Sequence, residues 1–321
     1  MGVNLRDLIA HKPLELSELS GKTIAVDALN SLYQFLASIR QPDGTPLMDG
    51  NGAVTSHLSG LFYRTARLVK IGIKPVYVFD GKPPELKLKE IEKRKKAKEE
   101  AQREWDKAKR EGRLEDARKY AMRTSRFTPE MLEESKKLLS LMGVPVIQAP
   151  GEGEAQCSLL AIRGDAWACG SQDYDALLFG TPRLVKGLTL SGELELSMID
   201  SAEALAQVGL TREQLVDVAI LVGTDFNDGV KGIGPKKGLA AVREGRMGEF
   251  DVPELAMLRD IFLKPDVLQD YRIAWSDVNA EGLVSFLAGE HSFSEDRIRR
   301  TAKDLSESYR QFQQQSISRW F

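Results

Sequence analysis

Residues 23–27 read Thr-Ile-Ala-Val-Asp, and residues 75–80 read Pro-Val-Tyr-Val-Phe-Asp. Each run is short, apolar and closed by an acid, which predicts two buried β-strands. Residues 54–72 between them place apolar side chains near the spacing of one helical face and end in Gly72, which predicts an amphipathic helix. This order predicts an α/β fold with a mostly parallel central sheet flanked by helices.

Two more strands are predicted further along the chain, at residues 144–147 and 166–169. The first follows a helix that should begin after Thr128, where a proline takes the first helical position, and end at Gly143. Thr211, with a glutamine three residues later, matches a capping box and predicts another helix. The alternation of strands and helices therefore extends well into the second half of the chain.

The composition changes abruptly between residues 85 and 126. This segment holds 9 Lys and 7 Arg against 8 Glu and 2 Asp, an excess of 16 − 10 = 6 positive charges. Apolar residues are sparse, so we expect charged helices that stand away from the core, with an interruption near Gly112. Taken alone, such a segment is more often a solvated helical surface than a binding element.

Acids follow the C-terminal ends of four predicted strands, and one more follows the end of a predicted helix. They are Asp27, Asp80, Glu152, Glu154, Asp173, Asp175 and Asp225. In a parallel sheet those strand ends share one edge, where ligands bind, so the first six carboxylates should converge. Asp225 follows the helix, and only the tertiary structure can bring it to the others.

So many anions at one edge would repel one another unless cations neutralise them. Oxygen ligands without a His or Cys partner suit Mg²⁺ or Mn²⁺, and two such ions can hydrolyse a phosphate ester. The competing interpretation is that each acid is a helix N-cap or a turn former, which is usual for a single Asp after a strand. Five acidic loci, two of them paired, make that interpretation poor for the set.

The whole-chain numbers exclude several other classes of protein. The net charge of −2 shows no overall basic field for nucleic acid, so the placement of charges matters more than their sum. Cys157 and Cys169 cannot form a disulfide framework, and with three histidines a zinc site is not expected; we interpret both as small buried side chains. Without a secretory segment or a membrane-spanning run, we expect a cytoplasmic protein with no membrane partner.

The acidic segments resemble the metal-site motifs of flap endonucleases. Asp27 lies in V-D-A-L-N-S-L-Y-Q-F, Asp80 in Y-V-F-D-G-K-P-P-E-L-K, Glu152 and Glu154 in A-P-G-E-G-E-A-Q, Asp173 and Asp175 in S-Q-D-Y-D-A-L-L-F-G, and Asp225 in G-T-D-F-N. The motif G-I-G-P-K-K follows where this XPG-related family of structure-specific 5′ nucleases has its helix-turn-helix DNA-binding element. The match spans nearly the whole chain in order, and its length and tail are most similar to the archaeal-type members.

This resemblance implies a PIN-like nuclease fold with a helical arch and a helix-hairpin-helix-type DNA-binding element. It implies a 5′ flap endonuclease with 5′–3′ exonuclease activity that leaves 5′-phosphate products in lagging-strand maturation and repair. Two Mg²⁺ per subunit, with Mn²⁺ as the alternative, are implied cofactors. Asp27, Asp80, Glu152 and Glu154 would serve one ion, and Asp173, Asp175 and Asp225 the other.

The resemblance also assigns residues that contact DNA. Lys87 and Arg94 match the basic pair near the base of the arch, where they would contact the scissile phosphate and stabilise developing charge. Tyr33 matches an aromatic that stacks on a base, although core packing would be the default interpretation for it. Arg40 and Arg64 could face DNA or be ordinary surface charges.

Gly232, Ile233 and Gly234, followed by a proline and two lysines, predict a hairpin that opens a helix. Backbone N–H groups of Gly232 and Gly234, with Lys236 and Lys237, could bind a phosphate of duplex DNA, although a plain tight turn would give the same pattern. In relatives a monovalent cation bridges this loop to phosphate, so K⁺ is expected at the hairpin from Gly229 to Gly234.

The chain ends in Gln-Gln-Ser-Ile-Ser-Arg-Trp-Phe, which fits the Q-x-x-h-x-x-a-a pattern of proteins that dock on PCNA-type sliding clamps. The predicted contacts are Gln314, Ile317, Trp320 and Phe321, presented on one turn of helix in an otherwise disordered tail. The competing interpretation is that the terminal aromatics fold back onto the core.

The expected organisation has a nuclease core in two parts, residues 1–99 and 128–256, the second with a helix-turn-helix element at 211–245. The arch would occupy residues 85–127, a C-terminal helical region 257–310 and the clamp-binding tail 311–321. We expect a monomer when free, with branched 5′ flap DNA and a sliding clamp as partners. The rival functions are a related metal nuclease without flap preference, such as an RNase or exonuclease, and a non-enzymatic DNA- and clamp-binding scaffold.

One departure from the family pattern concerns Gly151 and Gly153, where relatives are expected to have Ser and Ala. Glycine weakens the start of a helix by about 1 kcal/mol relative to alanine. Because neither position supplies a ligand, the departure should affect local rigidity and leave the chemistry intact.

Overall fold

A seven-stranded sheet in the order β1-β7-β6-β5-β2-β3-β4 forms the centre of the computed structural model, which describes residues 2–188 and 196–317. The strands are β1 (Lys12–Pro13), β2 (Thr23–Asp27), β3 (Lys74–Phe79), β4 (Val146–Gln148), β5 (Ala168–Gly170), β6 (Arg183–Lys186) and β7 (Ser197–Asp200). Strands β4, β3, β2, β5 and β6 are parallel neighbours, and β7 joins antiparallel to both β6 and β1. The predicted α/β fold with a mostly parallel sheet is confirmed.

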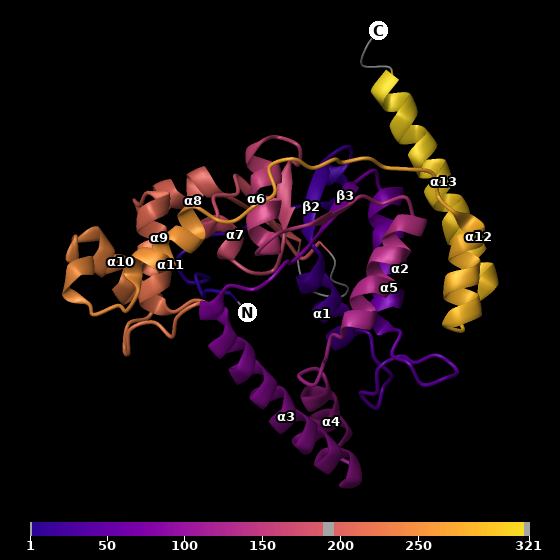
Figure 1. Cartoon of the computed structure of the whole chain (residues 1–321), viewed down its shortest axis with the longest axis horizontal. Coiled ribbons are helices and arrows are strands. Elements are labelled where there is room, and N and C mark those ends of the chain that lie inside the picture. The colour runs from indigo at the N-terminus through magenta and orange to yellow at the C-terminus, as the bar shows by residue number, and fades with distance from the viewer. Residues whose placement is uncertain (1, 189–195, 318–321) are drawn as a thin grey trace.

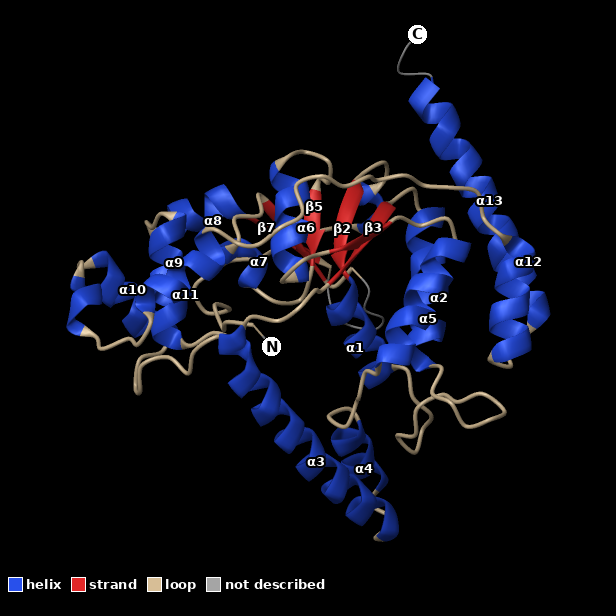
Figure 2. Cartoon of the chain, viewed as in Figure 1, coloured by secondary structure: helices blue, strands red, loops and turns tan. Residues whose placement is uncertain are grey.

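Helices cover both faces of this sheet (Figure 2). Successive residues of a strand point to opposite faces. Val76 and Val78 of β3 accordingly belong to one buried core, and Tyr77 and Phe79 belong to the other. Burial on both faces explains why the strands read as continuous apolar runs.

Helices within and around this core include those predicted at residues 54–72, after Thr128 and after Thr211. They are α1 (Ala28–Ser38), α2 (Ser56–Lys70), α5 (Pro129–Leu141), α6 (Gly153–Ile162), α7 (Asp175–Leu178), α8 (Ser201–Val208), α9 (Arg212–Val222), α10 (Pro235–Arg243), α11 (Leu255–Leu263), α12 (Ala280–Leu283) and α13 (Glu295–Ile317). Thr128 caps α5 by accepting the N–H of Met131, and the capping box at Thr211 is present. Short 3₁₀ segments lie at Leu16–Leu19, Glu85–Lys87 and Arg246–Glu249, and a π-helical turn at Val284–Glu290.

The charged segment forms two helices that project away from the sheet (Figure 1). They are α3 (Leu88–Arg110) and α4 (Leu114–Ala121), which pack against each other. Gly112, with φ +68°, makes the turn between them, as predicted from the sequence. Ala101 and Ala108 are the buried residues of α3, which agrees with a helix that carries almost no apolar surface.

An extended strap, residues 264–279, joins α11 to α12 on the opposite side of the sheet (Figure 1). Gln156 anchors its first part, donating to the carbonyl of Leu268 and accepting the N–H of the same residue. At its far end Ser276 N donates to the carbonyl of Gly143, and the indole N–H of Trp275 donates to the carbonyl of Pro75. The strap is therefore bonded to the body along its length.

The prediction of a disordered tail is wrong for residues 311–317, which continue α13. Glutamine is a good helix former, so a run of glutamines extends a helix that is already packed on the core. Trp320 and Phe321 lie outside the described residues, and Gln314 and Ile317 are described only as backbone of α13. No described helix is both long and apolar enough to cross a membrane.

Gly60 lies in α2 where this helix packs closely against α1. A Cβ at Gly60 would lie 2.3 Å from the ring of Phe35, whereas a Cβ at Gly238 in α10 would meet nothing closer than 3.5 Å. Both positions are helical, so alanine gains up to about 1 kcal/mol of propensity at each, but overpacking at Gly60 costs about 1–3 kcal/mol. We expect Gly60→Ala to lower the free energy of unfolding measured with denaturant and Gly238→Ala to leave it unchanged or raise it. Equal effects of the two changes would contradict this packing.

Candidate metal centre and nuclease site

The predicted acids meet at the C-terminal edge of the parallel strands, where backbone and side-chain donors fix them. Asp27, at the end of β2, caps α1 by accepting the N–H of Asn30 at 2.9 Å. Asp80 follows β3 and accepts the N–H of Gly153, the first residue of α6, at 2.9 Å. Asp175 accepts the N–H of Val3 at 2.8 Å, so the N-terminal segment also belongs to the site.

The remaining acids are tied to the same group. Ser171 donates its hydroxyl to Glu154 at 2.6 Å, and Asn30 donates its side-chain amide to Asp173 at 3.1 Å. Asp225 follows α9, and Lys87 lies between it and Glu152. Its charge also acts on Asp80 and Asp175. The structure thus brings all seven acids together, including the one that followed a helix.

Burial and mutual repulsion raise the pKa of four of these carboxylates, those of Asp27, Asp80, Glu154 and Asp175. Burial and, after it, the neighbouring Glu152 raise the pKa of Asp80 to about 6, against the opposing effects of Lys87 and the Gly153 N–H. Burial also raises the pKa of Asp175 to about 7, with Asp225 and Asp173 acting in the same direction. The pKa values of Asp27 and Glu154 are raised well above the ordinary range, first by burial and then by neighbouring acids. The site therefore favours cations or protons.

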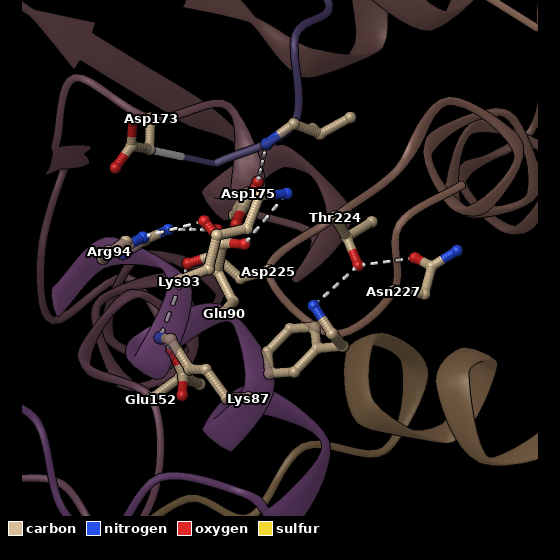
Figure 3. A network of polar contacts seen from close by, with 12 residues as sticks. Lys87, Glu90, Lys93, Arg94, Glu152, Asp173, Asp175, Thr224, Asp225 and Asn227 are labelled. Carbon is tan, nitrogen blue, oxygen red and sulfur yellow. Dashed lines mark hydrogen bonds and ion pairs between the residues drawn. The ribbon is translucent and has the colours of Figure 1, made fainter. Parts of the chain in front are cut away.

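Two basic side chains from the base of the charged helices reach into this cluster (Figure 3). Lys87 forms an ion pair with Glu152 and lies 3.7 Å from Asp225. Arg94 donates to Asp225 and to Glu90. Burial alone would lower the pKa of Lys87, but Glu152, Asp80 and Asp225 raise it above the ordinary value, so it stays charged. The pair predicted from the sequence is thus in contact with the acids.

The donor chemistry of this cluster fits hard divalent cations. All seven side chains offer carboxylate oxygens, which Mg²⁺ and Mn²⁺ prefer. Within the described residues, no three His, Cys, Asp or Glu side chains already have an arrangement that could hold a metal ion. Because Lys87 and Arg94 are paired with the acids, we expect them to yield their positions when divalent cations enter. A cavity of about 460 Å³ beside Asp225 lies between the base of α3 and residues 224–230 and 251–254.

Gly153 contributes more to the site than its sequence position suggested. Its Cβ, if present, would lie 2.4 Å from Oδ1 of Asp80, so the glycine permits the close approach of this carboxylate to the start of α6. The expected loss of rigidity is offset, because the same carboxylate accepts the Gly153 N–H and sits at the positive end of the helix.

Tyr33 lies on α1 beside the cluster and is 39% exposed, so it is not a core residue. Its ring lies 5.8 Å from the ring of Phe127, and Nζ of Lys98 lies 4.6 Å from its centroid. An exposed aromatic ring beneath a lysine of the arch is suited to stacking on a nucleobase near a phosphate.

The other predicted DNA contacts fall into two groups. Arg40 donates to Leu36, Gly44 and Ser125, so its guanidinium joins the loop after α1 to the segment that follows α4. Arg64 is half-buried and has partners within the protein, and burial lowers its pKa. Lys236 and Lys237, by contrast, are exposed at the start of α10.

The hairpin before α10 has the predicted form. Gly229 and Gly232 have φ +73° and +83°, and Gly234 is the N-cap of α10. Lys237 donates back to the carbonyl of Gly232 at 3.2 Å. The hairpin and α10 therefore present glycine backbone and two lysines together.

Two polar residues beside the acids were not predicted from the sequence. Asn30 holds Asp173 from α1, and Lys186, at the end of β6, donates to the carbonyl of Gln172. Burial lowers the pKa of Lys186 to about 8, while Asp173 and Glu154 act in the opposite direction. Asn30 lies three residues after a predicted ligand, which is a usable signal, but nothing local distinguishes Lys186 from a surface lysine.

Comparison with known proteins agrees with this geometry. Residues 1–101 match the XPG N-terminal domain, and residues 143–225 match the XPG I-region. The chain is 49% identical over 339 residues to flap endonuclease 1 of Pyrococcus horikoshii, covering 100% of this chain and 98% of that relative. It is also 49% identical over 330 residues to flap endonuclease 1 of Methanothermobacter thermautotrophicus, covering all of both chains.

Solved structures give the same result. Flap endonuclease-1 from Methanococcus jannaschii superposes with a TM-score of 0.81 at 41% identity, over 96% of this chain and 98% of that one. The catalytic core of Rad2 in complex with DNA substrate superposes with a TM-score of 0.71 at 26% identity, over 92% and 96% of the two chains. The chain therefore belongs to the flap endonuclease family.

Proposed function

We propose that this protein is a structure-specific nuclease that hydrolyses DNA at 5′ flap junctions with divalent cations, with an associated 5′–3′ exonuclease activity. The observation that carries the proposal is the cluster of seven carboxylates with Lys87 and Arg94 at the base of projecting helices. Its relatives of similar length are flap endonucleases, and we infer that the activity serves lagging-strand maturation and repair. The products would carry 5′-phosphates.

Two Mg²⁺ ions are the proposed cofactors, with Mn²⁺ as a substitute. Asp27, Asp80, Glu152 and Glu154 would hold one ion, and Asp173, Asp175 and Asp225 would hold the other. Bound there, the ions would lower the pKa of a water molecule and neutralise the scissile phosphate. Lys87 and Arg94 would turn from the acids to the phosphate, which offers the same negative charge, and would stabilise the charge that develops on it.

The DNA path runs from the cluster along the charged helices and the hairpin. Tyr33 would stack on a base beside the scissile bond, and α3 and α4 would form the arch over the single-stranded flap. Gly232, Gly234, Lys236 and Lys237 would hold duplex phosphate, and K⁺ at the hairpin would help to bridge the loop to that phosphate. Because the nitrogens of Arg40 bond to the protein itself, we assign it a supporting part in the loop.

A sliding clamp of the PCNA type is the proposed protein partner of an otherwise monomeric enzyme. The support is the terminal pattern with Gln314, Ile317, Trp320 and Phe321. Because residues 311–317 continue α13, the motif would be presented at the end of a helix that points away from the sheet (Figure 1).

Cleavage of a substrate panel tests the proposed function. With Mg²⁺ we expect a 5′ flap to be cleaved in preference to nicked, single-stranded and RNA substrates, and no cleavage in EDTA. Asp173→Ala should lower the rate by about 10²–10³-fold or more while flap binding stays largely intact, and Lys87→Ala or Arg94→Ala should lower it by about 10²-fold. Single-turnover rates and binding isotherms give these values.

Asp270→Asn, a change of an exposed acid, is the matched control and should cleave like the wild type. A preference for RNA or for single strands would favour the related nucleases without flap specificity. Cleavage that survives complete removal of metal would rule out the proposed mechanism.

The pH dependence of stability follows from the raised pKa values. As pH rises from about 4 to about 7, the unfolded chain releases protons from Asp80 and Asp175 before the folded protein does, since their ordinary pKa is 3.8. The free energy of unfolding in EDTA should therefore fall over this range, by about 1.4 kcal/mol for each unit of pKa shift. The Asp175→Asn variant keeps an oxygen that accepts the Val3 N–H and removes one titrating group. Its free energy of unfolding should therefore fall less over the same pH range.

Denaturant unfolding of both proteins at pH 4.5 and 7.5 measures the difference. Mg²⁺ should restore more stability to the wild type at pH 7.5 than at pH 4.5. An Asp175→Asn protein with the same pH dependence as the wild type would show that Asp175 does not titrate in this range.

Clamp binding can be separated from cleavage by changing the last two residues. Trp320→Ala with Phe321→Ala should abolish binding to a PCNA-type clamp, because the pair supplies the apolar contact. Cleavage without the clamp should stay as in the wild type, and Ser318→Ala serves as the control within the motif. Surface plasmon resonance with immobilised clamp measures binding, and unchanged affinity of the double variant would exclude this docking mode.

A further inference from the structure

Lys186 ends β6 next to the turn that carries Asp173 and Asp175. Val185 is paired with Gly170, the last residue of β5, and Lys186 is paired with Ser197 of β7. The N–H of Ser171 donates to the carbonyl of Val185 at 3.2 Å, so the chain leaving β5 stays against β6. The register of two strands therefore places Lys186 beside residues 172–174.

The side chain of Lys186 is held by that turn. Its ammonium donates to the carbonyl of Gln172, the residue that precedes Asp173. It also lies 3.7 Å from the ring centroid of Tyr174, a cation–π contact at short range. Tyr174 is fixed in turn, because its hydroxyl lies 2.6 Å from Nε2 of His11.

The turn is held from the opposite side by α1. Asn30 donates to Oδ2 of Asp173 at 3.1 Å, and its side-chain oxygen accepts the N–H of Gln172 at 3.4 Å. The residue Gln172 is thus bonded at its N–H by Asn30 and at its carbonyl by Lys186. The charge of Lys186 also acts on Asp173, Glu154 and Asp175.

We propose that Lys186 is a positioning residue that sets the orientation of the Asp173 carboxylate toward a divalent cation. The inference rests on the proposed function of the acidic cluster. Its action is through the backbone: the hydrogen bond to Gln172 and the contact with Tyr174 fix the residues on either side of Asp173. Lys186 is distinct from Lys87 and Arg94, which pair with the acids directly from the arch.

Two effects of Lys186 on metal binding have opposite signs, and this makes the inference testable. Loss of a nearby positive charge would by itself tighten binding of a divalent cation. Loss of a correctly placed ligand would weaken it. A positioning role predicts that the second effect dominates when the ammonium is removed and the side-chain volume is kept.

The experiment compares Lys186→Met and Lys186→Arg with the wild type. Calorimetric titration with Mn²⁺ in the absence of DNA should show weaker binding for Lys186→Met and recovery for Lys186→Arg. At saturating Mg²⁺ the single-turnover rate of flap cleavage should fall about 10–100-fold for Lys186→Met, with the Kd for flap DNA within twofold of the wild type. Lys12→Met, on the exposed strand β1, is the matched control and should match the wild type in each measurement.

Each other outcome overturns the proposal. Tighter Mn²⁺ binding by Lys186→Met would show that charge balance is its role, and a Kd that weakens as much as the rate would make it a DNA contact. Equal losses of Mn²⁺ affinity and cleavage rate in both variants, with a lower melting temperature in EDTA, would show that Lys186 contributes only to packing. If the wild-type protein cleaved no flap, the proposed function would fail, while the Mn²⁺ titration would still report on Lys186.

Discussion

The main physical constraint on this structure is that seven carboxylates lie together at one edge of a largely buried sheet. Burial and mutual repulsion both raise the free energy of the ionised cluster, as the raised pKa values of Asp80 and Asp175 show. Lys87 and Arg94 compensate from the base of the arch, through contacts with Glu152 and Asp225. Under the proposed function, the same two side chains would become available to the substrate phosphate once divalent cations had taken their place beside the acids.

The architecture supplies the cluster by simple means. Parallel strands deliver their C-terminal ends to one edge, and the loops that follow need only one or two residues to present an acid. The N-termini of two helices then stabilise some of the negative charge. Asp27 caps α1, and Asp80 accepts the N–H of the first residue of α6. The apolar cores on the two faces of the sheet hold the strands, and therefore the loops that follow them, in fixed relative positions.

Much of the fold and most of the acidic site could be predicted from the sequence, because the acids other than Asp225 follow the ends of predicted strands. Asp225 was the exception among the acids, since it follows a helix and only packing of α9 brings it to the site. Lys186 was missed because the sequence does not reveal which strand lies beside the Asp173 turn. Arg40 is open to interpretation as a DNA contact or a surface charge because the sequence does not reveal its three partners in the protein. Strand limits at residues 144–147 and 166–169 were displaced by one or two residues, since the apolar runs begin before the ladder does.

The strap of residues 264–279 has a mechanical consequence. It crosses from the side that carries α10 and α11 to the side that carries α12 and α13, and it is bonded at both ends. A chain segment cannot lengthen beyond about 3.3–3.6 Å per residue, so the strap sets an upper limit on the distance between the two ends that it joins. The strap therefore limits how far the side of the molecule that carries α10 and α11 can move from the side that carries α12 and α13, and a branched ligand that contacts both sides would have to fit within that limit.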